Sequence, residues 1–178
     1  KILVGEDEIE NWPEFIDVMA SSISDNGGRS CVNASAVIVP KYAQEIADAL
    51  GQRLGPLKPL SVEDPNAVLS GFANPKMGQW IDSAIDADLA MKGAIDATKP
   101  YRDGSRLVEA EGGTYLRPTV VHCDSMDHPL ANREFLCPYA SVVQIPQSEM
   151  LGSIGPTLVV TAITKDKDFQ RKLLSASN

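Results

Sequence analysis

The chain has 178 residues, of which 43% are hydrophobic and 22% charged, a composition that excludes a disordered protein and indicates one globular domain with a buried core. The formal net charge of −8 disfavours a nucleic-acid partner, because a phosphate backbone attracts basic proteins. No apolar run is long enough to cross a membrane, and no signal peptide opens the chain. We therefore expect a cytoplasmic protein that contacts no membrane.

The cysteine and histidine content indicates free thiols in a reducing compartment. The three cysteines, Cys31, Cys123 and Cys137, are odd in number and far apart, so neither a disulfide framework nor a zinc-ligand spacing is present. The two histidines, His122 and His128, add too few ligands for a metal site. We expect no bound metal.

Apolar residues recur at three- and four-residue spacing in several stretches, which is typical of helices that bury one face. The predicted helices span residues 9–23, 40–54, 76–91, 147–153 and 165–175. The first should end at Asn26-Gly27-Gly28, because glycine adopts the backbone conformations that stop a helix. In the third helix we place Trp80 in the core. Residues 55–76 contain four prolines and little periodicity, which favours a long ordered loop.

Apolar runs with strand character alternate with these helices. The predicted strands span residues 1–4, 36–39, 93–97, 115–121, 140–145 and 158–163. The last is the most apolar, so we expect it at the centre of the sheet. The polar, glycine-containing residues 101–113 favour a loop that exposes Arg102 and Arg106. Alternating strands and helices predict an α/β fold with an open, largely parallel sheet and helices on both faces.

A lone cysteine marks the junction between the first helix and the strand at 36–39. Cys31 follows Gly27-Gly28, where the backbone can turn sharply. A thiol at such a junction can face a cleft, with nearby backbone N–H groups free to stabilise an oxyanion. The alternative is that Cys31 is a small buried hydrophobe beside a tight turn.

Several stretches, in this order, resemble the catalytic domain of the NAD(P)-dependent aldehyde dehydrogenase superfamily. The family's Gly-Gln-x-Cys nucleophile segment is similar to Gly28-Arg29-Ser30-Cys31, and its Gly-Ala … Pro-Thr-Val run is similar to the residues from Gly93-Ala94 to Pro118-Thr119-Val120. Its Glu-x-Phe-Gly-Pro motif resembles Glu134-Phe135-Leu136-Cys137-Pro138, and its Thr-x-Asp turn resembles Thr164-Lys165-Asp166. The resemblance therefore covers nearly the whole chain.

This resemblance implies that residues 1–178 are a single catalytic, thiol-bearing domain of a longer enzyme. Lys1 lies where the family's Glu-Leu-Gly-Gly-Lys stretch ends, so the glutamate that acts as general base would precede Lys1, outside this chain. The Rossmann-type NAD domain, the end of the substrate tunnel and the oligomerisation strand would also lie outside. The implied cofactor is NAD or NADP, the implied substrate is an aldehyde, and the full-length protein would be a homo-oligomer. The isolated chain would be inactive.

The resemblance also implies roles for three residues. Cys31 matches the nucleophile, whose thiolate attacks the aldehyde to form a thiohemiacetal; hydride transfer leaves a thioester, which water hydrolyses to a carboxylic acid. Glu134 matches the residue that accepts hydrogen bonds from the nicotinamide ribose. Leu136 stands in place of the phenylalanine that packs near that ribose.

Two further departures from the motifs concern Arg29 and Cys137. Arg29 replaces the family's glutamine. It is either a cation that favours the Cys31 thiolate or a solvated charge at a turn. Cys137 replaces the glycine before Pro138 and lacks the backbone freedom of glycine.

Two other functions compete with this interpretation. A non-enzymatic α/β binding or assembly module would use Cys31 only for packing, and its thiol would react slowly. A cysteine hydrolase would need a histidine partner, for which the sequence offers only His122 and His128.

Overall fold

The structure is a computed structural model that describes residues 1–176, and its strands form a six-stranded sheet and a separate two-stranded hairpin. The strands are β1 (Ile2–Val4), β2 (Ala36–Val39), β3 (Ala94–Asp96), β4 (Leu107–Ala110), β5 (Gly113–Leu116), β6 (Thr119–Cys123), β7 (Tyr139–Gln144) and β8 (Thr161–Ile163). The helices are α1 (Ile16–Ser24), α2 (Ala43–Leu54), α3 (Pro75–Leu89), α4 (Gln147–Ser153) and α5 (Lys167–Ser175). Four of the five predicted helices are present within a few residues of their expected bounds, whereas the first, predicted from residue 9, begins as an α-helix only at Ile16.

The large sheet has the strand order β3-β6-β7-β2-β1-β8. Every neighbouring pair is parallel except β3–β6, which is antiparallel. The prediction of an open, largely parallel sheet is therefore confirmed. Because parallel neighbours run in the same direction, the segments that enter β7, β2, β1 and β8 all arrive at one edge of the sheet.

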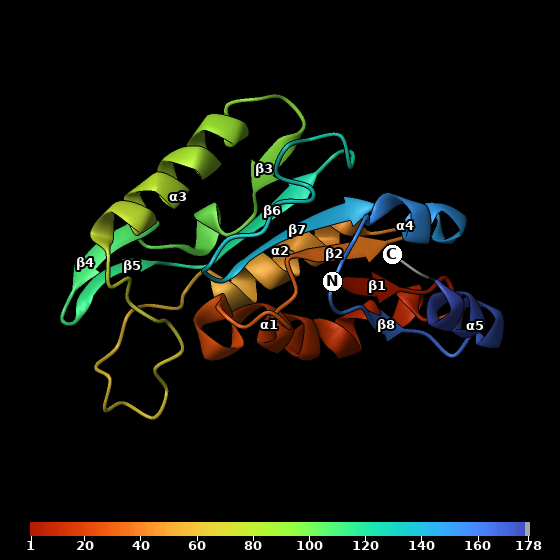
Figure 1. Cartoon of the computed structure of the whole chain (residues 1–178), viewed down its shortest axis with the longest axis horizontal. Helices are drawn as coiled ribbons and strands as arrows, with labels where there is room; N and C mark the ends of the chain where they lie inside the picture. The colour runs from red at the N-terminus through yellow and green to blue at the C-terminus, as the bar shows by residue number, and fades with distance from the viewer. Residues whose placement is uncertain (177–178) are drawn as a thin grey trace.

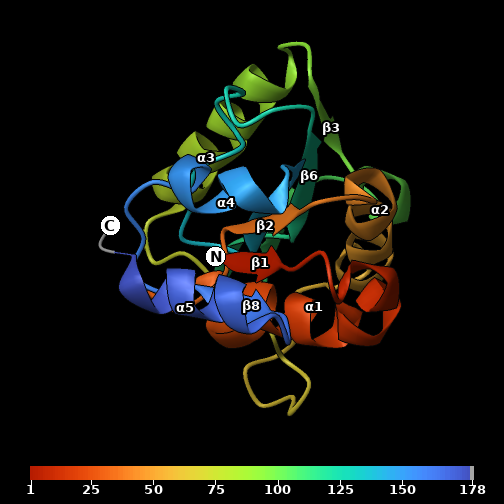
Figure 2. The same cartoon turned by 90° about the vertical axis from the view of Figure 1, so that its right-hand side faces the viewer.

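Helices cover both faces of this sheet, as predicted (Figures 1 and 2). In β2, Val37 and Val39 pack with residues of α1 and α2, whereas Ala36 and Ile38 belong to the cluster that includes residues of α3, α4 and α5. This alternation follows from the two-residue repeat of a strand. A strand buried on both sides must be apolar throughout, and β2 is fully buried.

The prediction that residues 158–163 form a central strand is wrong. Only Thr161–Ile163 form a strand, β8, and it lies at the edge of the sheet, bonded to β1 alone. Leu158 is 74% exposed, while Val160 packs against the core on one side. The apolar residues of this run therefore pack on one face of the sheet or line a pocket, and do not form a central strand.

The placement of Trp80 in the core is also wrong, because its side chain is 60% exposed. Helix α3 turns Gly78, Ile81 and Ile85 towards the protein instead. Gly78 allows the close approach, since a Cβ there would lie 3.2 Å from Thr114 Cγ2 in the hairpin.

Residues 101–113 are not simply an exposed loop. Residues 107–116 form the β4–β5 hairpin, which lies along α3 in Figure 1, and Arg117-Pro118 separates β5 from β6 so that 115–121 is not one strand. The predicted exposure of Arg102 and Arg106 is wrong, because both side chains are buried. Arg102 pairs with Asp96 at 2.7 Å, and Arg106 pairs with Asp82 on α3 at 2.8 Å. These ion pairs compensate the cost of burying the charges.

The first helix and the long loop largely follow the sequence. A 3-10 segment at Ile9–Phe15, which contains Pro13, precedes α1, because proline cannot donate the backbone bond of an α-helix interior. Residues 55–74 connect α2 to α3 without a helix, as predicted. Within residues 1–176 no helix combines the length and apolarity needed to span a bilayer.

Candidate functional site

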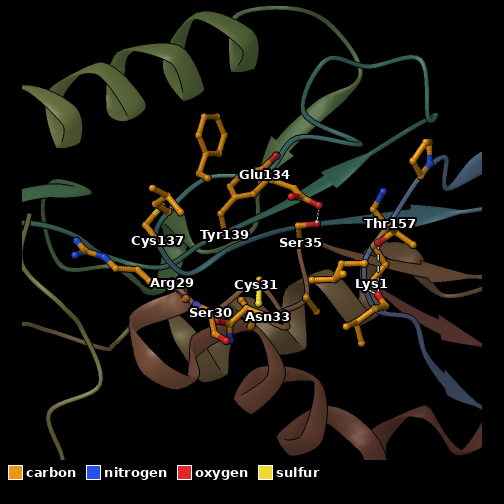
Figure 3. A pocket seen from close by; sticks show the side chains of 18 residues that line it. Lys1, Arg29, Ser30, Cys31, Asn33, Ser35, Glu134, Cys137, Tyr139 and Thr157 are labelled. Atoms are coloured by element: carbon orange, nitrogen blue, oxygen red, sulfur yellow. Dashed lines mark hydrogen bonds between the residues drawn. The ribbon is translucent and has the colours of Figure 1, made fainter. Parts of the chain in front are cut away.

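A pocket of about 770 Å³ lies where the chain enters four neighbouring parallel strands. Its lining comes from residue Lys1 before β1, the segment 28–35 before β2, the segment 134–139 at β7 and residues 156–159 before β8. The pocket thus lies at the amino ends of these strands. Its lining includes all three residues that the sequence singled out, Cys31, Glu134 and Leu136. Figure 3 shows Cys31 and Glu134 in the pocket.

Cys31 occupies the tip of a tight turn that follows α1. The turn is closed by the Asn33 N–H, which donates to the Ser30 carbonyl at 3.0 Å. Cys31 and Val32 are its central residues, and both are exposed. The alternative in which Cys31 is a small buried hydrophobe is therefore wrong. Among the described residues, neither the Cys31 N–H nor the Val32 N–H donates a hydrogen bond, so both are free to bind an oxyanion.

Asn33 fixes this turn to the end of α1, a role that the sequence analysis missed. Its Oδ1 accepts from the Ser30 N–H at 2.7 Å, and its Nδ2 donates to the carbonyls of Ser22 and Asp25, both at 3.0 Å. The signal was present, because asparagine side chains often bond to backbone groups at turns. The turn is consequently held from within and from the helix.

The backbone of the turn touches the segment that carries Glu134. Gly28 has φ of +65°, and a Cβ at this residue would lie 2.4 Å from Pro138 N and 2.5 Å from Cys137 C. Asn26 and Gly27 also have positive φ values, which confirms that the helix ends here as predicted. Only glycine permits both this conformation and this contact. Cys137 itself does not have a positive φ, so it occupies the place of a glycine without backbone strain.

Glu134 lies across the pocket from Cys31 (Figure 3), and Leu136 lines the same pocket. Glu134 is exposed, and its Oε1 accepts a hydrogen bond from Ser35 Oγ at 3.3 Å. The carboxylate therefore keeps free lone pairs that can accept further bonds. Leu136 is 59% exposed and offers an apolar surface beside that carboxylate.

Lys1 joins two walls of the pocket. Its ammonium group donates to Asn132 Oδ1 and to the Ile154 carbonyl, the latter at 2.6 Å. Asn132 shortly precedes Glu134 in the chain, and Ile154 shortly precedes the pocket residues 156–159. Asn132 Nδ2 also donates to the Ile154 carbonyl at 3.4 Å. Burial lowers the pKa of the Lys1 ammonium from its ordinary value, and the Glu134 carboxylate opposes this shift.

Arg29 is half-buried and is not directed at the thiol. Its guanidinium lies over the Phe72 ring, 4.3 Å from the ring centroid, and its Nη2 donates to the Ser70 carbonyl at 3.0 Å. Figure 3 shows the side chain pointing away from Cys31. The side chain is therefore not a cation placed beside the Cys31 thiol, and its partly exposed guanidinium is held on Phe72.

The three thiols differ strongly in environment. Cys123 and Cys137 are buried, and burial raises the pKa of each thiol to about 12. Cys31 alone is exposed. It is therefore the one cysteine of this chain whose thiol a substrate can approach from solvent.

Neither histidine lies near enough to Cys31 to line its pocket. His122 belongs to β6, and His128 is buried, with Nδ1 accepting from the Leu130 N–H at 3.2 Å. A hydrolase built on a cysteine and a histidine thus lacks its partner here. Among residues 1–176 no group of three or more histidine, cysteine, aspartate or glutamate side chains is arranged to hold a metal ion.

Comparisons with known proteins identify the fold. No protein-family model and no curated protein sequence matches the chain. Among solved structures, 3,6-anhydro-L-galactose dehydrogenase in complex with NAP matches with a TM-score of 0.79 and 18% identity, over 98% of this chain and 36% of that one. Lactaldehyde dehydrogenase from Escherichia coli matches with a TM-score of 0.77 and 18% identity, over 97% and 35%.

The NAD⁺ complex of aldehyde dehydrogenase from Bacillus cereus also matches, with a TM-score of 0.77 and 18% identity, over 97% of this chain and 34% of that one. At such identity the comparisons show a shared fold. Nearly all of the chain, 97–98%, has the fold of part of an aldehyde dehydrogenase, and the chain spans about a third of the length of these structures.

Proposed function

We propose that this chain is the thiol-bearing catalytic domain of an NAD(P)-dependent aldehyde dehydrogenase. The observation that carries the proposal is the pocket in which the exposed Cys31 thiol faces Glu134 and Leu136. Those three residues were singled out by their match to the family's motifs, and their presence in the lining of one pocket supports the proposal. The structures that share the fold are themselves aldehyde dehydrogenases.

Cys31 is the nucleophile in this proposal. Its thiolate attacks the carbonyl carbon of an aldehyde, and the carbonyl oxygen becomes an alkoxide. Cys31 lines the pocket, and its own N–H, which donates no hydrogen bond within the described residues, is the donor that the turn offers to this oxyanion. For the thiohemiacetal to become a thioester, its carbon must lose a hydride, which bound NAD(P)⁺ would accept; water would then release the carboxylic acid and the free Cys31 thiol.

The residues opposite Cys31 fit a dinucleotide cofactor. Glu134 has carboxylate lone pairs available for the two hydroxyls of a ribose, and Leu136 presents an exposed apolar surface beside it. Bound NAD(P) would supply the hydride acceptor. Glu134 would hold the ribose, and Leu136 would cover the face of the sugar or ring.

The proposal includes two parts outside this chain. The general base that activates water would precede Lys1, and a dinucleotide-binding domain would complete the cofactor site. Residues 1–178 alone should then catalyse no aldehyde oxidation. NAD(P)H formation from an aldehyde by the isolated chain, measured by absorbance, would contradict this division of domains.

Replacement of Cys31 tests the assignment of the nucleophile. In the complete protein, Cys31→Ser should lower the rate of aldehyde-dependent NAD(P)H formation by about 10⁴-fold or more, because a hydroxyl replaces the attacking thiolate. The matched control is Cys123→Ser, which changes a buried cysteine outside the pocket and should leave kcat largely intact.

Alkylation of Cys31, together with the Cys31→Ser variant, distinguishes the dehydrogenase from the alternative of a non-enzymatic binding or assembly module. If Cys31 reacts with iodoacetamide no faster than Cys123 and Cys137, and Cys31→Ser retains full dehydrogenase activity, the thiol has no chemical role. A rapid, NAD(P)-dependent loss of activity on alkylation of Cys31, located by peptide mass spectrometry, would support the dehydrogenase.

A further inference from the structure

We propose that residues 70–72 clamp the Cys31 turn through Arg29, which makes Arg29 and Phe72 positioning residues for the nucleophile. The catalytic part of this inference rests on the proposed function. The structural part rests on two contacts between the segment 70–72 and the residues that precede Cys31, and on the anchoring of that segment to the rest of the fold.

The first contact is the stacking of Arg29 on Phe72. The guanidinium lies 4.3 Å from the ring centroid, and its Nη2 donates to the Ser70 carbonyl at 3.0 Å. A cation over an aromatic face is attracted by the ring quadrupole. A glutamine, which stands at this position in the family's motif, has no positive charge for such a contact.

The second contact is the close approach of Gly27 to Ser70. A Cβ at residue 27 would lie 2.5 Å from Ser70 Oγ and 3.0 Å from Ser70 N. Gly28 meets the backbone of Cys137 and Pro138 in the same way. The chain that leads into the turn is therefore held between two backbone segments, and Arg29 extends the contact with one of them.

The third observation is that the clamp is itself anchored. Phe72 is 7% exposed, belongs to the core cluster and donates its N–H to the Thr114 carbonyl of β5 at 2.7 Å. Residues 70–72 are thus fixed to the β4–β5 hairpin. Contacts that hold Arg29 in place also limit the movement of the Ser30–Asn33 turn, because Arg29 directly precedes this turn in the chain.

Arg29 acts through the backbone in this arrangement, and not by placing its charge on the thiol. Figure 3 shows its side chain directed away from Cys31, on the Cys137 side of the pocket. Small displacements of a nucleophile are costly, because the attack needs a defined geometry. The clamp keeps the Cys31 N–H and thiol oriented together towards the pocket.

A double-mutant cycle in the complete protein tests the clamp, with Arg29→Gln, Phe72→Leu and the combined variant. Two rates are measured: the alkylation of Cys31 by iodoacetamide across the neutral pH range, and steady-state aldehyde oxidation. We expect each single variant to slow alkylation by about threefold to tenfold, the range of a cation–aromatic contact. We expect kcat to fall by at least as much, with KM for the aldehyde little changed.

The combined variant should be no slower than the worse single variant, because both changes remove the same contact. Arg29→Lys keeps a cation over the ring and should restore most of the rate. The matched control is Arg53→Gln, which removes an exposed arginine of α2 and should change neither rate. Thermal unfolding of each variant verifies that it is folded at the assay temperature.

Three results would overturn the clamp. The first is a loss of rate in the combined variant that equals the sum of the two single losses in free energy, and the second is an unchanged alkylation and oxidation rate in Phe72→Leu. The third is a pH profile of Cys31 alkylation that shifts in Arg29→Gln but not in Phe72→Leu. The last would mean that the Arg29 charge acts on the thiol directly. If Phe72→Leu fails to fold, the alkylation rates of Arg29→Gln and Arg29→Lys test the clamp: a slow Arg29→Gln with a nearly normal Arg29→Lys supports it, and equal rates overturn it. Absence of dehydrogenase activity in the unaltered protein would refute the proposed function, while the alkylation cycle would still decide the clamp.

Discussion

Ser35 Oγ donates a hydrogen bond to Glu134 Oε1 at 3.3 Å, and this bond joins two segments that are far apart in the sequence. Ser35 comes just after the Cys31 turn and leads into β2, whereas Glu134 precedes β7. Because β2 and β7 are parallel neighbours, both segments end at the same edge of the sheet. The bond sets the carboxylate opposite the thiol.

Glu134→Gln tests the role of this carboxylate. Removal of a charged acceptor should raise KM for NAD(P), or lower kcat, by about tenfold to a hundredfold, since a hydrogen bond to a charged group contributes roughly 1.5–3 kcal/mol. The matched control is Glu149→Gln, which changes an exposed glutamate of α4 outside the pocket. Equal steady-state constants for both variants would argue against cofactor binding by Glu134.

Gly28→Ala should destabilise the protein, because the added Cβ meets the backbone of Cys137 and Pro138 and φ is +65°. We expect the free energy of unfolding in urea to fall by about 2–4 kcal/mol. The control is Gly152→Ala in α4, where a Cβ would meet nothing within 4 Å. That change should raise stability by about 0.5–1 kcal/mol. A neutral Gly28→Ala would show that the two segments are not in tight contact.

The buried thiols predict a pH dependence of stability. Burial raises the pKa of Cys123 and Cys137 from 9.0 to about 12 in the folded state. Between pH 9.0 and about 12 the folded state therefore binds more protons than the unfolded state. The stability that the two thiols contribute is complete below pH 9.0 and is lost as the pH rises towards 12. Urea midpoints should therefore fall as pH is raised above about 9. Cys123→Ala should reduce that slope.

Arg102→Met probes the buried ion pair that the sequence did not anticipate. The change leaves the Asp96 carboxylate buried without its closest cation, and breaking such a pair costs about 3–5 kcal/mol. Arg53→Met removes an arginine whose pair with Asp17 is exposed, and should cost under about 1 kcal/mol. Similar urea midpoints for the two variants would mean that the Arg102 pair contributes no more than a surface pair.

Features that depend on neighbouring residues followed from the sequence. The apolar spacing of 76–91 and the β-branched run 36–39 specify α3 and β2, because the helix and strand repeats are local. The end of the first helix was readable for the same reason, since Gly27 and Gly28 are residues that adopt positive φ. The match of Cys31, Glu134 and Leu136 to known motifs pointed to one site before any distance was known.

Features that depend on distant partners were decided by the tertiary structure. The run 158–163 is apolar enough for a central strand, yet within the described residues β8 lies at the edge of the sheet beside β1. Apolar residues of this run also line the pocket and pack on one face, so hydrophobicity by itself did not identify a central strand. From the sequence, Arg106 was predicted to be a surface residue. In the structure it is buried because Asp82 of α3 lies beside it, and a buried charge needs such a counter-charge.

The sequence by itself determined the alternation of helices and strands, the junction at Cys31 and the residue types of the site, because each is written in short-range patterns. Only the tertiary structure decided that Cys31 is exposed, that Lys1, Cys31 and Glu134 share a pocket, and that Arg29 rests on Phe72. The physical reason is that parallel pairing brings the amino ends of distant strands to one edge of the sheet, where their entering segments meet.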